Sequence, residues 1–164
     1  MKAYYGALLS AAVLAAGTAA AQDEEGLSGR VAFGYLSTSG NTETDNLNLA
    51  FGGNINADQW HHSLDGLAVK ASSSGVDTAE AYALAWKTKY DLTDTNYLFG
   101  MVAWNKDEFS GYDQQLREVF GYGRRFINRE RHVLNAEAGV GLRQSDLRAG
   151  TSEDASILRL ATDY

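Results

Sequence analysis

Between Leu27 and Tyr164, several stretches alternate apolar and polar residues with a period of two, although the apolar residues of 60–71 fall on both faces. The clearest stretch has an apolar side made of Leu47, Leu49, Phe51, Gly53 and Ile55, and a polar side made of Asn46, Asn48, Ala50, Gly52 and Asn54. Successive side chains of a β-strand point to opposite faces, so this period predicts strands with one apolar face. After the first 21 residues, no stretch keeps apolar residues at the helical spacing of i, i+3, i+4 and i+7, and we expect an all-β fold.

The alternation predicts eight strands, each close to the ~9–11 residues that a tilted membrane-spanning strand needs. Their expected ranges are 27–38, 45–56, 59–71, 79–92, 96–106, 116–127, 132–143 and 156–164. The sequence contains no proline. This absence suits a chain made mostly of paired strands, because proline removes a hydrogen bond from a β-ladder.

The first 21 residues have the composition of an export signal. Lys2 supplies a positive charge, residues 7–16 form a short apolar core, and residues 19–21 are the small residues typical of a signal-peptidase site. The apolar core is too short to cross a bilayer as a helix, which takes ~20 residues. We therefore predict a signal peptide at 1–21 and a mature, exported chain at 22–164.

Two all-β architectures share this alternation: a soluble β-sandwich, and an antiparallel up-and-down transmembrane β-barrel. The lengths of the expected connections separate them. The connections after the second, fourth and sixth strands are short, whereas those after the third, fifth and seventh are longer and polar, at 72–78, 107–115 and 144–155. Short turns on one side and long loops on the other are typical of outer-membrane barrels.

Aromatic residues fall near both ends of the expected strands. Beside the short connections lie Trp60, Tyr90, Tyr97 and Phe126, and towards the long ones lie Tyr35, Tyr82, Trp104 and Phe109. Two such bands are expected where amphipathic rings settle at the level of the lipid headgroups. The polar face, rich in small residues and asparagine, fits a crowded barrel interior. We predict a transmembrane barrel with about eight strands present.

Two blocks of sequence carry a resemblance to a known family. The first block, 34–44, contains Ser39, Gly40, Asn41 and Thr42, and the second, 105–113, contains Asp107, Phe109 and Gly111 in an Asp-x-Phe-x-Gly pattern. A Gly-x-Gly strand at 121–123 follows. Together they resemble the salt-induced outer-membrane protein family of Gram-negative bacteria, over roughly Gly29 to Leu142.

The resemblance implies an outer-membrane location and a barrel architecture. The family has no established enzymatic activity, so the resemblance implies no catalytic residues. Its members usually continue with further strands, and we therefore expect this chain to be a fragment of a longer barrel.

Each block also has an interpretation from its residues alone. Gly40 and Asn41 tolerate positive φ and can form a tight turn, with a surface ligand site as the less favoured alternative. The acidic residues around Asp107 could bind a cation, but they lack a metal-binding spacing, and a solvated acidic loop is the favoured interpretation.

The interior of the predicted barrel receives charged side chains. If the apolar faces point to lipid, the lumen-facing charged residues are Lys87, Lys89, Arg117, Arg125 and Glu137. An eight-strand barrel is just filled by its side chains, and opposite charges would pair and close it. With about twelve strands a narrow aqueous path would open, and the same basic residues would favour anions. The sequence leaves both states open.

Several classes of chemistry find no support. The absence of cysteine excludes disulfides and thiolate catalysis. The 14 Lys and Arg residues against 21 Asp and Glu give a net charge of -7, which speaks against nucleic acid as a partner. His61 and His62 are adjacent in a strand and face opposite sides, and His132 lies by a short turn. We expect no enzymatic activity, no cofactor and no metal.

The expected function is that of a non-enzymatic outer-membrane barrel, in envelope integrity or in small-solute passage under salt or osmotic stress. Its partners would be outer-membrane lipid and, by class, the periplasmic chaperones and the barrel-assembly machinery. The alternative is a soluble periplasmic β-barrel that binds an apolar ligand. Extraction separates the two, because only the membrane barrel needs detergent.

Overall fold

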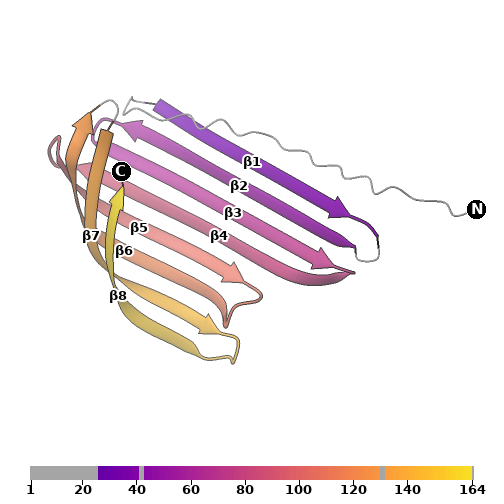
Figure 1. Ribbon diagram of the computed structural model, residues 1–164. Coiled ribbons are helices and arrows are strands. Elements are labelled where there is room, and N and C mark those ends of the chain that lie inside the picture. The colour runs from indigo at the N-terminus through magenta and orange to yellow at the C-terminus, as the bar shows by residue number, and fades with distance from the viewer. Residues whose placement is uncertain (1–25, 41–42, 130–131, 164) are drawn as a thin grey trace, which may run out of the picture.

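The chain forms one β-sheet in a computed structural model that describes residues 26–40, 43–129 and 132–163 (Figure 1). The strands are β1 (Gly26–Thr38), β2 (Thr44–Ala57), β3 (Trp60–Ser73), β4 (Val76–Asp91), β5 (Asn96–Asp107), β6 (Tyr112–Arg129), β7 (His132–Leu147) and β8 (Ser152–Asp163). Over these ranges no helix is long and apolar enough to cross a membrane.

The sheet is an antiparallel up-and-down meander in the order β1-β2-β3-β4-β5-β6-β7-β8. This arrangement confirms the all-β fold and the eight strands that the alternation predicts. In the described part of the chain β1 and β8 are the two edges and do not pair with each other. The sheet is therefore open, and these eight strands do not close a barrel by themselves.

The strands are longer, and the connections shorter, than the sequence predicted. The long connections expected at 72–78, 107–115 and 144–155 are wrong, because most of these residues extend the strands. Between β3 and β4 the chain turns through Ser74 and Gly75 alone, at φ values of 51° and 77°. Polar residues beyond the apolar part of each strand still pair across the ladder: Lys70 lies opposite Glu80 on the neighbouring strand. The apolar alternation stops there, but the backbone pairing continues.

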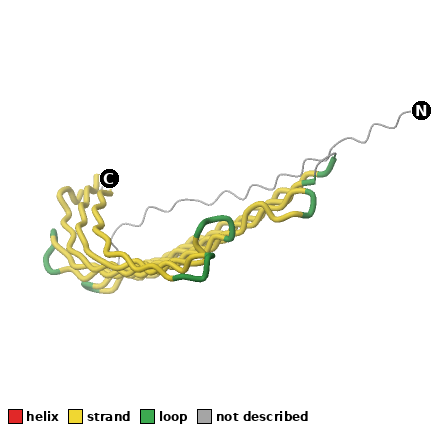
Figure 2. The backbone as a smooth tube through the Cα atoms, turned by 90° about the horizontal axis from the view of Figure 1, so that it is seen from below, coloured by secondary structure: helices red, strands yellow, loops and turns green. Residues whose placement is uncertain are grey.

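The sheet curls towards one of its faces, as Figure 2 shows at the end where β6 to β8 lie. On β4, Lys87 contacts Glu137 on β7, with Nζ 2.5 Å from Oε1. Strands that are three places apart in a flat sheet lie about 14 Å apart, at ~4.8 Å per strand. These two side chains meet because β5 and β6 bend underneath them. We name the face that carries Lys87 and Glu137 the concave face, and the opposite one the convex face.

Glycines in β6 and β7 allow this curl. A Cβ on Gly121 would lie 2.3 Å from the carbonyl oxygen of Ala138, and one on Gly141 would lie 2.0 Å from that of Glu118. Real side chains do not approach a backbone this closely, so the two strands can bend here only without side chains at these positions.

Aromatic rings fill the space that the glycines leave. Tyr97 and Phe99 on β5 are 0% and 1% exposed, and they pack with Val119 into a small core on the concave face. From the sequence, Tyr97 is expected in the aromatic band beside the short connections, on the outward face of this strand. That prediction is wrong: Leu98 and Val102 occupy the convex face instead, by the register with β4.

The glycine contacts predict a specific loss of stability. We expect Gly141→Ala to lower the free energy of unfolding by about 1–3 kcal/mol, because its Cβ would overlap the backbone of β6. Urea titration of the refolded chain measures this loss. Gly34→Ala is the control, since the nearest atom to its Cβ would be 4.0 Å away. Equal unfolding midpoints for the two variants would contradict the proposed role of Gly141.

Candidate functional site

A buried ion-pair cluster occupies the concave face around Glu137, whose side chain is completely buried. Its two carboxylate oxygens accept hydrogen bonds from Lys87 Nζ at 2.5 and 2.6 Å. Tyr97 donates its hydroxyl to Oε1 at 3.0 Å, and Arg159 on β8 donates to Oε2 at 3.3 Å. Four strands thus meet at one carboxylate, which stabilises the curl of the sheet.

A second group of charges lies beside this cluster, nearer the end of the sheet with the β4–β5 turn. Asp91 accepts hydrogen bonds from Arg125 at 2.9 Å and from His61 at 3.0 Å. The guanidinium of Arg125 and the ammonium of Lys89 lie 5.0 and 5.1 Å from the ring centre of Tyr97. The ring of Tyr97 therefore connects the two groups, with cations against it and its hydroxyl on Glu137.

The structure places all five charged residues that the sequence assigned to the barrel interior on the concave face. Four of them, Lys87, Lys89, Arg125 and Glu137, come together around Tyr97. Arg117 lies apart from them, and its guanidinium is 3.5 Å from Asn105 Oδ1. That this face lines a lumen remains a prediction.

Sequence reasoning missed three members of these clusters: Arg159, Asp91 and Tyr97. Arg159 alternates with Leu158 and Leu160, a signal that could have placed it on the polar face of β8. Tyr97 gave a weaker signal, because apolar residues occupy both faces of β5. The Gly-x-Gly pattern of β6 and the glycines of β7 were the available evidence that large rings could fit above them.

The convex face is apolar and largely uncovered. Its exposed side chains include Phe33 at 51%, Phe120 at 61%, Val140 at 66%, Leu158 at 72% and Leu160 at 73%. They run across all eight strands, because the alternation puts apolar residues on this face in each one. Glu118, opposite Val102 and Leu142, is an exposed charged side chain among them. We name this band of apolar side chains the convex belt.

Aromatic residues with polar tips border the convex belt on both sides. On the side of the β2–β3 and β4–β5 turns, Trp60 packs on Tyr90 at 4.8 Å between ring centres. On the other side, Tyr35, Tyr82 and Trp104 donate hydrogen bonds to Asp45, Glu80 and Gln114, at 3.1, 3.2 and 3.2 Å. The rings flank the belt, and these polar tips are bonded to polar residues beyond it. Apolar bodies with hydrated tips are typical of a boundary between hydrocarbon and water.

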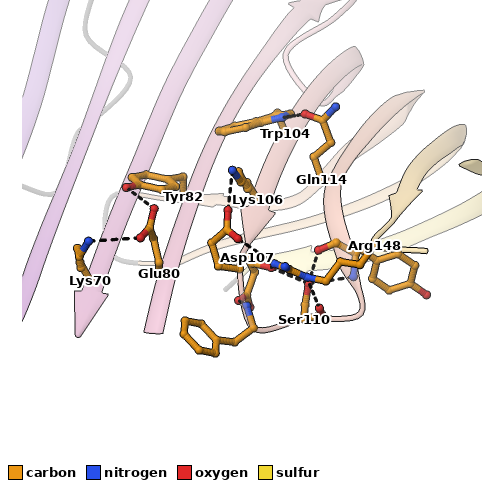
Figure 3. A network of polar contacts seen from close by, with 12 residues as sticks. Lys70, Glu80, Tyr82, Trp104, Lys106, Asp107, Ser110, Gln114 and Arg148 are labelled. Atoms are coloured by element: carbon orange, nitrogen blue, oxygen red, sulfur yellow. Dashed lines mark hydrogen bonds and ion pairs between the residues drawn. The ribbon is translucent and has the colours of Figure 1, made fainter. Parts of the chain in front are cut away.

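A polar network holds the β5–β6 turn to the β7–β8 turn (Figure 3). Arg148 donates to the carbonyl oxygens of Ser110 and Asp107, at 3.0 and 3.2 Å, and pairs with the Glu108 carboxylate at 3.2 Å. Lys106 pairs with the same carboxylate at 2.6 Å. The hydrogen bonds from Lys106 and Arg148 hold the pKa of the Glu108 carboxyl below its usual value, so it stays ionised in mildly acidic solution.

The residues of the second sequence block build this turn. Asp107 Oδ1 accepts the backbone N–H of Phe109 at 2.9 Å, and the carbonyl of Gly111 accepts the backbone N–H of Arg148. Phe109 is 57% exposed. These contacts organise the turn through its own backbone and through Arg148. They give the block a structural role.

The first block lies at the β1–β2 connection. Ser39 and Gly40 follow β1, and the hydroxyls of Thr38 and Thr44 hydrogen-bond across its base. Asn41 and Thr42 lie outside the described residues. Gly40 does not adopt the positive φ that it tolerates, whereas Asp58 and Ser74 adopt one at other turns. The base of this connection is held by threonine side chains instead.

His61 and His62 point to opposite faces, as their adjacency predicts. His61 lies in the concave group with Asp91, and the ring of His62 stacks on Trp60 on the convex side, at 5.9 Å. In the part of the chain that the structure describes, no three His, Asp or Glu side chains are arranged to hold a metal ion.

Comparisons with known proteins identify relatives. A family profile described as "Protein of unknown function, DUF481" matches residues 31–164. The "Uncharacterized protein YdiY" of Escherichia coli (strain K12) is 35% identical over 129 residues, which are 76% of this chain and 50% of that protein. The chain thus spans about half the length of this relative. No solved structure matches the present chain. These matches confirm the family that the two sequence blocks predicted, and neither description names a function or location.

We expect the loss of the buried carboxylate Glu137 to destabilise the protein much more than the loss of an exposed carboxylate on the same face. We expect Glu137→Gln to lower the free energy of unfolding by about 3–5 kcal/mol, because it leaves Lys87 and Arg159 without their buried counter-charge. Asp65→Asn is the matched control: its pair with Arg30 is exposed, and its loss should cost about 0–1 kcal/mol. Urea titration of both refolded variants measures the difference. Similar losses in both would show that the cluster does not hold the curl.

Proposed function

We propose, starting from the fact that the chain belongs to the DUF481 family, that its sheet forms part of the wall of an outer-membrane β-barrel. The convex belt faces lipid, and the concave face with the Glu137 cluster lines the interior. In this arrangement each strand crosses the bilayer once.

The observation that supports the proposal best is the convex belt with its two aromatic borders. A folded protein in water does not usually leave a continuous apolar surface exposed over a whole sheet, and such a surface marks contact with lipid or another protein. The belt crosses every strand and is bordered by Trp60 and Tyr90 on one side and by Tyr82 and Trp104 on the other. Transmembrane barrels have the same order of aromatic, apolar and aromatic residues on their outer surface.

The concave face supports the second half of the proposal. The charged side chains and the histidine on this face need water or other polar groups as hydrogen-bonding partners, and lipid hydrocarbon offers none. A soluble barrel that binds an apolar ligand would have the opposite distribution, with apolar side chains inside and polar ones outside. The direction of the curl therefore favours the membrane barrel over that alternative.

The two edges of the sheet add a requirement. Unpaired N–H and C=O groups along β1 and β8 would each cost several kcal/mol in hydrocarbon. The proposed barrel is therefore completed by strands that pair with both edges.

The role that follows is non-enzymatic: passage of small polar solutes along the charged interior, or envelope integrity, under salt or osmotic stress. Export would use the signal peptide proposed at residues 1–21, which lie outside the described residues. Insertion would then use the periplasmic chaperones and the barrel-assembly machinery, and the lasting partner would be outer-membrane lipid.

A pair of adjacent arginine substitutions tests the orientation of the sheet. Leu84→Arg puts a charge in the convex belt and should cost about 2–4 kcal/mol of stability in lipid vesicles. Ala85→Arg puts the same charge on the concave face, opposite Asp65, and should cost less than about 1 kcal/mol. Denaturant titration in vesicles compares the two variants. Equal costs, or release of the wild-type chain by osmotic shock without detergent, would contradict the proposal.

A further inference from the structure

A separate cavity of about 370 Å³ lies on the concave face, between β5, β6, β7 and β8. Its polar lining consists of Arg117, Arg143, Arg159 and Gln115, and its apolar lining comes from Met101 and Val119 and from residues 157, 158 and 160 of the edge strand β8. Three arginines from three different strands thus line one cavity. None of the residues that form the polar network of the β5–β6 turn lines this cavity.

The positive charges in this cavity are not balanced. Arg117 and Arg143 lie directly opposite each other on β6 and β7, and like charges in this position repel. Over residues 26–40, 43–129 and 132–163, neither guanidinium pairs with a carboxylate. Arg117 makes one long hydrogen bond, to Asn105, and Arg159 shares Glu137 with Lys87.

Buried donors in and beside the cavity also lack acceptors. The Nε atoms of Arg143 and Arg159 are buried without a hydrogen-bond partner. Ser145 lies two residues along β7 from Arg143 and is 1% exposed. Its hydroxyl also has no hydrogen-bond partner in the described chain. Buried polar groups are nearly always hydrogen-bonded, and a buried charged donor without an acceptor is especially costly. These donors therefore require an acceptor from outside the described chain.

We infer that this cavity binds a small dissolved oxyanion of the phosphate type. Planar guanidinium groups offer paired N–H donors that match the oxygens of such an anion, and a single anion between Arg117 and Arg143 would remove their repulsion. The position on the polar concave face, opposite the convex belt, favours a dissolved anion over a lipid headgroup. The three arginines lie on the concave face, so the proposed anion contacts do not depend on what covers the convex one.

Calorimetric titration with inorganic phosphate tests the site. The purified full chain, in detergent free of phospholipid and at constant ionic strength, should bind one phosphate in a saturable way. Arg143→Gln should weaken this binding at least tenfold. Arg30→Gln is the matched control, because Arg30 lies on the same face but pairs with Asp65 at 2.8 Å; its binding should equal that of the wild type. If Arg143→Gln does not fold, Arg117→Gln should show the same loss.

A second measurement separates a binding role from a structural one. Without phosphate, Arg143→Gln should unfold at the same urea concentration as the wild type or at a higher one, because it removes the repulsion with Arg117. Phosphate should then raise the unfolding midpoint of the wild type and leave that of the variant unchanged. The inference is overturned if the folded wild type shows no saturable binding, or if Arg30→Gln weakens binding as much as Arg143→Gln does.

Discussion

The contact between Lys87 and Glu137 joins strands that would be far apart in a flat sheet, and the rest of the structure is arranged around it. The carboxylate is completely buried and has partners on three other strands: Lys87, Tyr97 and Arg159. A buried charge with these partners is tolerable only while the curl keeps them in reach. The glycines at 121 and 141 let the backbone follow that curl, and Tyr97 and Phe99 fill the space above them.

The curl also separates two surfaces of opposite character. Ion pairs gather on the concave face, where side chains converge and can satisfy one another. Apolar side chains spread apart on the convex face, where nothing in the described chain covers them. A sheet with this asymmetry cannot obtain its stability from a core of its own, since few residues besides Tyr97, Phe99, Ala103 and Val119 are buried apolar ones. The proposed barrel wall provides what is missing, because lipid would cover the belt.

Alternation alone predicted much of the fold. Strand β2 was expected at 45–56 and spans Thr44–Ala57, and Lys87 and Glu137 were assigned to the same face from their parity. Parity says which face a side chain lies on, but it does not describe curvature. It could not predict that these two residues touch, or that Tyr97 turns inwards over Gly123. The polar ends of the strands were missed for another reason: residues such as Lys70 and Glu80 pair through the backbone without an apolar face to signal it.

The position of the three tryptophans tests the central claim, that the convex face lies in lipid. Trp60, Trp86 and Trp104 all lie on this face, with Trp86 between the two aromatic borders. Single-tryptophan variants in vesicles can be quenched with lipids brominated at different depths along the acyl chain. We expect deep bromines to quench Trp86 most strongly and shallow bromines to quench Trp60 and Trp104. Quenching of all three by a water-soluble quencher, with none by brominated lipid, would contradict the placement of the convex face in lipid.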